Sequence, residues 1–289
     1  MSAAKNILVT GANGQLGMEF RLLAQKFTSY HFLFAGKEEL SIDNPVSIEH
    51  YFAEHAIQVC INCAAYTAVD KAEVEREAAM HINATAVGQL ANMCKQYNVT
   101  FFHFSTDYVF NGMGTAPYKE SDPTAPVNYY GQTKLLGEAA AMASNADSVI
   151  IRTSWVYSSF GKNFVKTMLR LMSEKEQIAV VADQFGCPTY AGDLAAAVMQ
   201  IIDAGKIIPG IYHYSNEGII SWHQFALAIK ELTYSACTVN AIETSAYPTP
   251  AARPHYSALD TSKVKDTYEL QINFWRSRLE HCITIIRNN

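Results

Sequence analysis

The chain has 289 residues, of which 49% are hydrophobic and 17% charged, so it can bury a large core in one large domain or two intimate ones. Its formal net charge of -5, together with the lack of a basic run, disfavours non-specific nucleic-acid binding and leaves a small-molecule partner. No apolar stretch approaches the ~18 residues of a membrane-spanning helix, and Met1-Ser2-Ala3-Ala4 leaves no room for a signal peptide, so we expect a cytoplasmic protein.

The first elements predict a nucleotide-binding turn. Residues 5–10 have the pattern of a short buried strand, and residues 18–27 have the periodicity of a helix. Three glycines between them would allow a tight turn, close approach to a pyrophosphate and packing of helix on strand, while the helix start offers free amides. Such a turn is often only a connection, but its position and its pairing with Tyr130 and Lys134 favour dinucleotide binding. The residues concerned are Gly11, Asn13, Gly14, Gln15, Leu16 and Gly17.

The end of the next strand, predicted at residues 31–35, bears on the type of cofactor. An acidic residue at this place usually holds a free 2′-hydroxyl of the adenosine ribose, and none is present here. Lys37 could face a 2′-phosphate instead, although a solvated loop lysine is about as common. We therefore predict NADPH, with NADH also usable.

Strands and helices then alternate along the chain. This order predicts an α/β fold with a doubly wound, Rossmann-type parallel sheet, whose ligands bind at the carboxyl ends of the strands. We expect strands at residues 59–64, 100–105 and 148–153, and helices at residues 46–55, 73–97 and 129–143.

Cys60 and Cys63 form a C-x-x-C pair that could indicate a structural zinc site. The pair lies in an expected buried strand, where residues three apart point to opposite faces, and a second C-x-x-C is missing. We expect no metal, and interpret all six cysteines as small buried hydrophobic residues in a reducing compartment.

A catalytic centre is predicted from the end of the strand at 100–105 and the helix at 129–143. Thr106 places a hydroxyl at the strand end, and Tyr130 and Lys134 share one face of the helix. A phenol titrates near pH ~10, and an ammonium group beside it would bring its pKa closer to the working pH of a general acid. Taken singly, Tyr130 could be a packing residue, Lys134 a surface charge and Thr106 a cap of the next turn, but their joint spacing favours catalysis. His103, in the apolar run before Thr106, is interpreted as a core histidine.

The C-terminal part has less regular periodicity and more turn residues, which suggests a smaller substrate lobe. We divide the chain into a dinucleotide-binding domain at 1–157 and a lobe at 158–289. Asp193 and Ser221 are candidate helix caps. Trp155 could stack on a sugar or base, or could be core packing, and Arg253 could bind a pyrophosphate, or could be a solvated loop residue.

Together, several segments resemble the extended short-chain dehydrogenase/reductase family and, within it, the dTDP-4-dehydrorhamnose reductases. These segments are residues 11–17, 64–73, 105–110, 130–134, 152–157 and 186–189. The resemblance implies reduction of the C4 ketone of dTDP-4-dehydro-L-rhamnose to dTDP-L-rhamnose.

The same resemblance implies roles for individual residues. Thr106 would bind the substrate carbonyl, Tyr130 would protonate the alkoxide, and Lys134 would hold the nicotinamide ribose. Asp107 would lie against the sugar, unless it only forms a turn. Further cofactor positions are Asp43 near the adenine, and Ala64, Ala65 and Tyr66 at a strand end.

The family also includes dimers that share a magnesium ion, for which Glu19 matches one ligand position. The other ligands cannot be matched, so the metal is left out and a homodimer stays open; parts of 158–289 are expected to return to the dinucleotide domain. Two other functions stay open as well. One is another nucleotide-sugar enzyme, such as a 4-epimerase or 4,6-dehydratase, although Tyr108 follows Asp107 where dehydratases usually have a second acidic residue. The other is a regulatory subunit like the β subunit of methionine adenosyltransferase.

Overall fold

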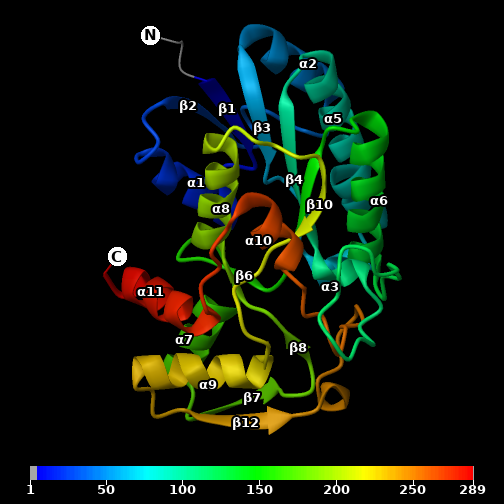
Figure 1. Cartoon of the computed structure of the whole chain (residues 1–289). Helices are drawn as coiled ribbons and strands as arrows, with labels where there is room; N and C mark the ends of the chain where they lie inside the picture. Colours follow the sequence, from blue (N-terminus) through cyan, green and yellow to red (C-terminus); the bar gives the residue numbers. More distant parts are fainter. Residues whose placement is uncertain (1–4, 289) are drawn as a thin grey trace.

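A parallel six-stranded sheet forms the centre of the molecule, in a computed structural model that describes residues 5–288 (Figure 1). The sheet order is β10-β5-β4-β3-β1-β2, and all five neighbouring pairs are parallel. Its strands are β1 (Lys5–Thr10), β2 (Tyr30–Ala35), β3 (Ile57–Asn62), β4 (Thr100–Thr106), β5 (Val149–Thr153) and β10 (Gly210–His213). The predicted α/β fold is confirmed. The expectation about Met1–Ala4 lies outside the described residues.

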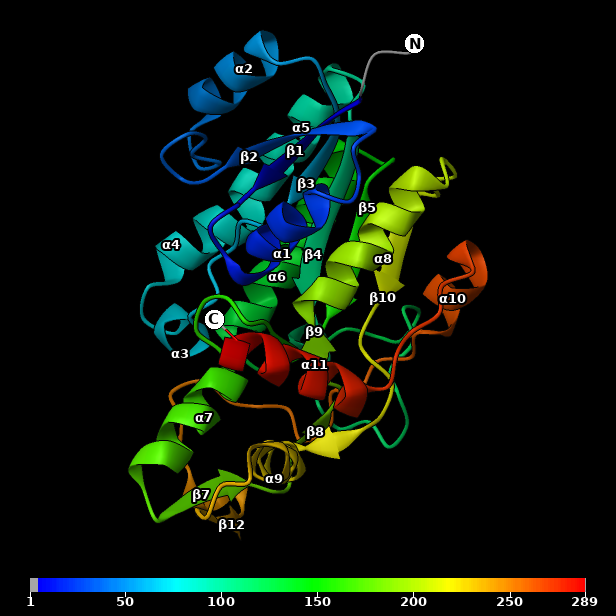
Figure 2. The same cartoon turned by 90° about the vertical axis from the view of Figure 1, so that its left-hand side faces the viewer.

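Helices cover both faces of this sheet (Figure 2). On one face lie α1 (Gln15–Ala24) and α8 (Ala191–Asp203), which contact each other, and on the opposite face lie α2 (Pro45–Glu54), α5 (Ala86–Gln96) and α6 (Tyr129–Ser144). Alternate strand residues supply the two cores, as period-two geometry requires: Ile7 and Val9 face α1 and α8, whereas Leu8 faces the other layer.

The prediction of one continuous helix at 73–97 was wrong, because the helical region starts at a different residue and is interrupted. The chain forms a short α3 (Val69–Ala72), then α4 (Arg76–Met80), a π-helical turn (His81–Thr85) and α5. Asn83 in the π turn is buried and exchanges hydrogen bonds with the Tyr66 backbone, its Oδ1 accepting at 2.9 Å and its Nδ2 donating at 3.0 Å. The wider turn thereby ties this helix to the loop after β3, a tertiary bond that helical periodicity does not encode.

The C-terminal lobe is a separate cluster of helices around short strand pairs. Its helices are α7 (Phe164–Glu174), α9 (Trp222–Thr233) and α11 (Trp275–Asn288). Its strand pairs are β6 (Val156–Tyr157) with β9 (Thr189–Tyr190), β7 (Gln177–Val181) with β12 (Thr238–Ile242), and β8 (Phe185–Gly186) with β11 (Ile220–Ser221). Aromatic and aliphatic side chains of α7, α9 and α11 share one core. The domain division at residue 157 stays a prediction.

The two cap predictions had opposite outcomes. Ser221 caps α9 in a capping box: its Oγ accepts from the Gln224 amide at 3.2 Å, and Gln224 Oε1 accepts from the Ser221 amide at 2.8 Å. Asp193 is not a cap, because α8 begins two residues earlier, at Ala191. Its carboxylate lies 2.9 Å from Arg278 Nε, which draws it into the interface with α11.

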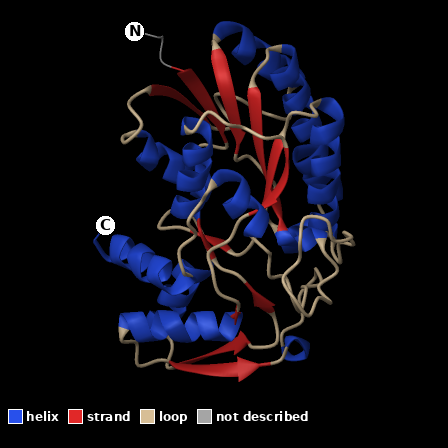
Figure 3. Cartoon of the chain, in the orientation of Figure 1, coloured by secondary structure: helices blue, strands red, loops and turns tan. Residues whose placement is uncertain are grey.

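Two long loops complete the molecule, at residues 110–128 and 247–261, beside the carboxyl end of the sheet (Figure 3). A short 3₁₀ turn (Asp107–Val109) precedes the first, and another (Thr244–Ala246) precedes the second. α10 (Ser262–Tyr268) follows the second loop and contacts β10. Among residues 5–288, no helix is long and apolar enough to cross a membrane.

Candidate active site

In the turn between β1 and α1, two glycines are required because a side chain at either position would collide with neighbouring backbone. Gly11 has φ +60°, and a Cβ there would lie 2.6 Å from the Ala64 amide nitrogen. A Cβ at Gly17 would lie 2.6 Å from the Ala12 Cα. At Gly14 a Cβ would meet only the Gly11 carbonyl oxygen, at 3.3 Å. Gly11 and Gly17 are thus needed for packing, and Gly14 leaves backbone open beside the turn.

A cavity of about 430 Å³ opens beside this turn. Of the predicted cofactor residues, it is lined by Gly11, Asn13, Gly14, Lys37, Asp43, Ala64, Ala65 and Tyr66. Gln15, Leu16 and Gly17 are not part of the lining. Gln15 Oε1 instead accepts from Asn163 Nδ2 at 2.8 Å, which links the turn to the start of α7.

Lys37 stands at the edge of this cavity and is 81% exposed, with its Nζ 3.9 Å from an Asp43 carboxylate oxygen. A hydrogen bond from Ser41 and the charge of Lys37 lower the pKa of Asp43. This cavity suits the adenosine part of a dinucleotide. It combines open backbone at the glycine turn, the exposed cation of Lys37 and the apolar side chains of Ile42 and Ile82.

Thr106, Asp107 and Tyr130 gather at the carboxyl end of β4. The Thr106 hydroxyl donates to Asp107 Oδ1 at 3.0 Å and accepts from the Tyr108 amide at 3.2 Å. Asp107 Oδ2 is buried and has no hydrogen-bond partner among the described residues. Burial raises the pKa of Asp107 to about 7, and the hydrogen bond from Thr106 opposes this change.

Tyr130 is placed by the first turn of α6. Asn128 caps this helix, accepting from the Gly131 amide at 2.8 Å, and the Tyr130 ring meets the Tyr108 ring edge-on with centroids 6.0 Å apart. Burial and the Asp107 carboxylate raise the pKa of Tyr130 to about 12, while a hydrogen bond with Thr106 lowers it in part. This direction is opposite to the lowering that Lys134 was expected to bring.

Lys134 lies one turn further along α6 and is 2% exposed. Its Nζ donates to the Phe104 carbonyl at 2.6 Å and lies 3.3 Å from His103 Nε2. Burial lowers the pKa of Lys134 to about 8, and the charge of Glu138 opposes this change. The fold therefore brings Thr106, Tyr130 and Lys134 together where β4 ends and α6 begins.

A larger cavity, of about 1030 Å³, lies between the two parts of the molecule. The sheet side contributes Thr67, Asp70 and Tyr108, and the lobe contributes α7, β7 and Trp222. Arg253 lines it too, but Trp155 does not. Trp155 stacks on Trp222 with centroids 3.5 Å apart, and so supports the wall from behind.

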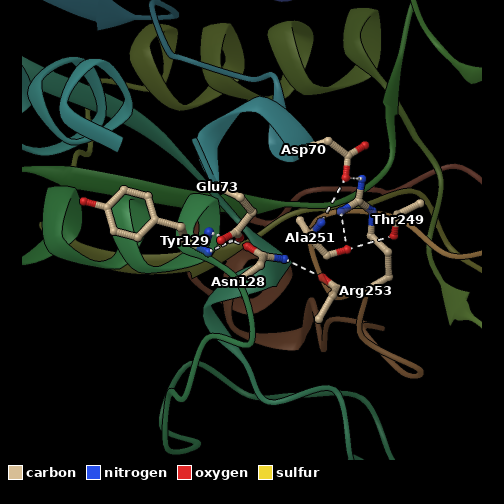
Figure 4. A network of polar contacts seen from close by, with 9 residues as sticks. Asp70, Glu73, Asn128, Tyr129, Thr249, Ala251 and Arg253 are labelled. Atoms are coloured by element: carbon tan, nitrogen blue, oxygen red, sulfur yellow. Dashed lines mark hydrogen bonds and ion pairs between the residues drawn. The ribbon is translucent and has the colours of Figure 1, made fainter. Parts of the chain in front are cut away.

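Arg253 is held in a network that joins its loop to the start of α6 (Figure 4). Its guanidinium lies 2.9 Å from an Asp70 carboxylate oxygen and donates to the Ala251 carbonyl at 3.0 Å. Asn128 Nδ2 donates to the Ala252 carbonyl at 2.8 Å, so the residue that caps α6 also fixes this loop. Arg253 is thus a paired residue at the cavity edge, and not a solvated loop arginine.

Glu19 faces the lobe and not the cavity beside the glycine turn. Its carboxylate accepts from Ser158 Oγ at 2.6 Å and lies 3.4 Å from the Tyr190 hydroxyl. Burial raises the pKa of Glu19. Within residues 5–288, no group of three or more His, Cys, Asp or Glu side chains could hold a metal ion.

Some site residues escaped the sequence analysis. Tyr108 contacts Tyr130 and lines the large cavity, and Trp222 and Lys162 line it as well. The position of Tyr108 directly after Thr106 and Asp107 was a usable signal. Trp222 and Lys162 come from distant segments that only the fold brings to the cavity.

Comparison with known proteins identifies similar chains over the full length. A family model described as the RmlD substrate binding domain matches residues 5–288. A dTDP-4-dehydrorhamnose reductase of Burkholderia thailandensis is 40% identical, covering 96% of this chain and 97% of its own.

Two solved structures have a TM-score of 0.94. One is a dTDP-4-dehydrorhamnose reductase of Clostridium acetobutylicum, 38% identical, covering 98% of this chain and 99% of its own. The other is a dTDP-4-dehydrorhamnose reductase of Bacillus anthracis in complex with NADP, 36% identical, covering 97% and 99%.

Proposed function

The chain belongs to the RmlD family of dTDP-4-dehydrorhamnose reductases, and from this premise we propose that it reduces dTDP-4-dehydro-L-rhamnose to dTDP-L-rhamnose with NADPH. The observation that carries the proposal is the gathering of Thr106, Tyr130 and Lys134 at the end of β4, beside Tyr108, which lines the larger cleft. Full-length similarity to reductases supports the choice of reaction over an epimerase, a dehydratase or a regulatory subunit.

In this proposal Tyr130 is the general acid. Its high pKa keeps the phenol protonated at neutral pH, so the proton is available when the ketone oxygen gains negative charge. Thr106 donates a hydrogen bond to that oxygen, for which its hydroxyl would turn away from Asp107. Lys134 holds the nicotinamide ribose and, when protonated, favours the phenolate that Tyr130 becomes.

The smaller cavity would hold the adenosine half of NADPH. The backbone at Gly14 and the start of α1 would face the pyrophosphate, and Lys37 would face the 2′-phosphate with its ammonium group. The reduced nicotinamide supplies the hydride. NADH would bind less tightly because it lacks a partner for Lys37.

The larger cleft would hold the nucleotide sugar. Asp107 would accept from a sugar hydroxyl through the oxygen that has no partner in the described chain. Arg253 would bind a pyrophosphate oxygen, in exchange for part of its contact with Asp70. Trp155 would support the sugar site indirectly, by holding Trp222, on which it stacks, in the wall of the cleft. The partner is thus a small molecule.

The test is to mix the purified protein with NADPH and dTDP-4-dehydro-L-rhamnose and follow the absorbance of the reduced nicotinamide. We expect a substrate-dependent fall with dTDP-L-rhamnose as product. Binding of NADPH without turnover of this ketone would contradict the substrate assignment. Tightly bound NAD in the purified protein would instead favour an epimerase or dehydratase.

A further inference from the structure

A chain of buried polar side chains runs behind Lys134, away from the substrate cleft. Lys134 Nζ lies 3.3 Å from His103 Nε2, and His103 Nδ1 lies 3.1 Å from Asn62 Nδ2. Asn62 Oδ1 then accepts from Thr10 Oγ1 at 2.6 Å and from the Ala64 amide at 3.2 Å. Each of the four side chains in this chain is at most 2% exposed, so no bulk water competes for these contacts.

The direction of each hydrogen bond in this chain follows from its far end. The Ala64 amide can only donate, which fixes Asn62 Oδ1 beside it and turns the Asn62 amino group towards His103. An amino group can only donate as well, so His103 Nδ1 must accept and carries no hydrogen. Burial lowers the pKa of His103 well below its usual value, so the ring is neutral. A neutral ring with a bare Nδ1 carries its hydrogen on Nε2, which faces Lys134.

An ammonium group at Lys134 does not fit this arrangement. It has three hydrogens and no lone pair, so the N–H of His103 would point at another donor. An uncharged amine has a lone pair for His103, one hydrogen for the Phe104 carbonyl and one left over for a ligand. We propose that His103 is a positioning residue that holds Lys134 as an uncharged amine, in a fixed orientation, before nucleotide binds.

The charges around Lys134 are compatible with this state. On α6 itself, Glu138 is the nearest carboxylate, and it is engaged by Ser105 of β4 and by Arg152 of β5, at 2.5 Å and 2.7 Å. Tyr130 is neutral, and Asp107, in the 3₁₀ turn after β4, faces Tyr130. Since burial, against the charge of Glu138, lowers the pKa of Lys134 to about 8, a roughly tenfold further bias from the His103 hydrogen bond makes the amine a major form at neutral pH.

The uncharged state of Lys134 does not depend on the proposed function, and only its role in catalysis rests on that function. Lys134 would take up a proton when nucleotide binds, and His103 would then have to shift its hydrogen from Nε2 to Nδ1 or leave Asn62. We therefore expect net uptake of protons when NADPH is added at pH 7.5 in a weakly buffered solution.

The direct test is ¹⁵N NMR of the histidine side chains in the full chain without nucleotide. The His103 signals are assigned by their loss in His103→Gln or, should that variant not fold, in His103→Asn. We expect Nε2 to be protonated and Nδ1 bare between pH 6 and 9. A hydrogen on Nδ1, or a charged ring, would overturn the proposal. Because no substrate is present, this result does not depend on which reaction the protein catalyses.

The substitution Asn62→Asp should reverse the tautomer of His103. A carboxylate can only accept, so it would draw the hydrogen of His103 to Nδ1 and leave Nε2 free to accept from an ammonium group at Lys134. We expect the two nitrogen signals to exchange their character in this variant. Thr10→Val is the matched control, because it removes a donor to Asn62 but leaves the amino group facing His103. An unchanged tautomer in Asn62→Asp, or an exchanged one in Thr10→Val, would contradict the proposal.

Discussion

At the scale of single residues, the site combines two acidic groups whose protons are held by burial. Tyr130 and Asp107 both have a raised pKa, and the Thr106 hydroxyl lies between them in the hydrogen-bond pattern. Such a pair can keep a proton near a reacting oxygen at neutral pH, which is what a reductase of this type needs.

Tyr130→Phe tests the general acid. We expect kcat to fall by roughly two to four orders of magnitude, because a positioned acid is lost, while the KM for NADPH changes little. Steady-state kinetics with dTDP-4-dehydro-L-rhamnose measures both. Tyr129→Phe, one residue away, is the matched control and should keep normal turnover. A rapid Tyr130→Phe enzyme would refute this role.

Asp107→Asn tests the pKa of the buried carboxyl through stability. The folded-state pKa of about 7 lies above the ordinary value of 3.8. Between these two values the folded protein keeps a proton that the unfolded chain releases, so the free energy of unfolding falls as pH rises from 4 to 7. At ~1.4 kcal/mol per pKa unit, the wild type should lose roughly 3–4 kcal/mol over this range relative to Asp107→Asn. If the free energies of unfolding of the wild type and Asp107→Asn, measured in urea, changed in parallel with pH, the pKa of Asp107 would not be raised.

Residue types and spacing indicated candidate reacting groups, whose roles stay a prediction, but not their surroundings. Thr106, Tyr130 and Lys134 stand out because the strand end and one helix turn fix their approximate positions in advance. Asn62 and His103 have no such signal, since each is an ordinary buried residue until β3 and β4 are set side by side. The direction of the Tyr130 pKa was also beyond reach, because it depends on burial that only packing defines.

At the scale of elements, local rules worked where local contacts decide. The capping box of α9 uses only Ser221 and Gln224, three residues apart, and Ser221 was predicted as the cap. The start of α8 and the π turn at His81–Thr85 are fixed by partners more than 15 residues away, such as Tyr66 for Asn83. Long-range bonds of this kind override local preference.

Ser221→Ala tests the cap. We expect a loss of about 1 kcal/mol in the free energy of unfolding, because the Gln224 amide loses its acceptor. Urea denaturation measures the change, and the KM for NADPH should not move. Ser245→Ala, at an exposed serine in the 3₁₀ turn Thr244–Ala246, is the control and should change stability by less than about 0.5 kcal/mol. Equal effects of the two substitutions would argue against a capping contribution.

At the scale of the whole molecule, the sheet and the lobe each provide one wall of the large cleft. The alternation of strands and helices predicted the central sheet, but its order could not be predicted. β10 follows β5 by more than 50 residues and yet pairs with it, because the hydrophobic faces of α8 and β10 fit the exposed edge of the sheet.

Nucleotide binding should stabilise the whole chain, since it favours the folded state by mass action. At a concentration of 100 times the Kd, NADP⁺ should add about 2.7 kcal/mol, which differential scanning fluorimetry would detect as a rise in Tm of a few degrees. Lys37→Ala should weaken NADP⁺ binding roughly tenfold and leave NAD⁺ binding unchanged. Lys95→Ala, on the exposed side of α5, is the control. Equal losses for both nucleotides in Lys37→Ala would contradict a contact with the 2′-phosphate.

The most direct test of C4 ketone reduction follows the hydride itself. NADPH carrying deuterium at C4 of the nicotinamide, each diastereomer in turn, would be incubated with dTDP-4-dehydro-L-rhamnose and the sugar analysed by NMR and mass spectrometry. We expect dTDP-L-rhamnose with one deuterium at C4 of the sugar, from one diastereomer only. A product without the label from both diastereomers, or with deuterium at another carbon, would contradict reduction of the C4 ketone at this site.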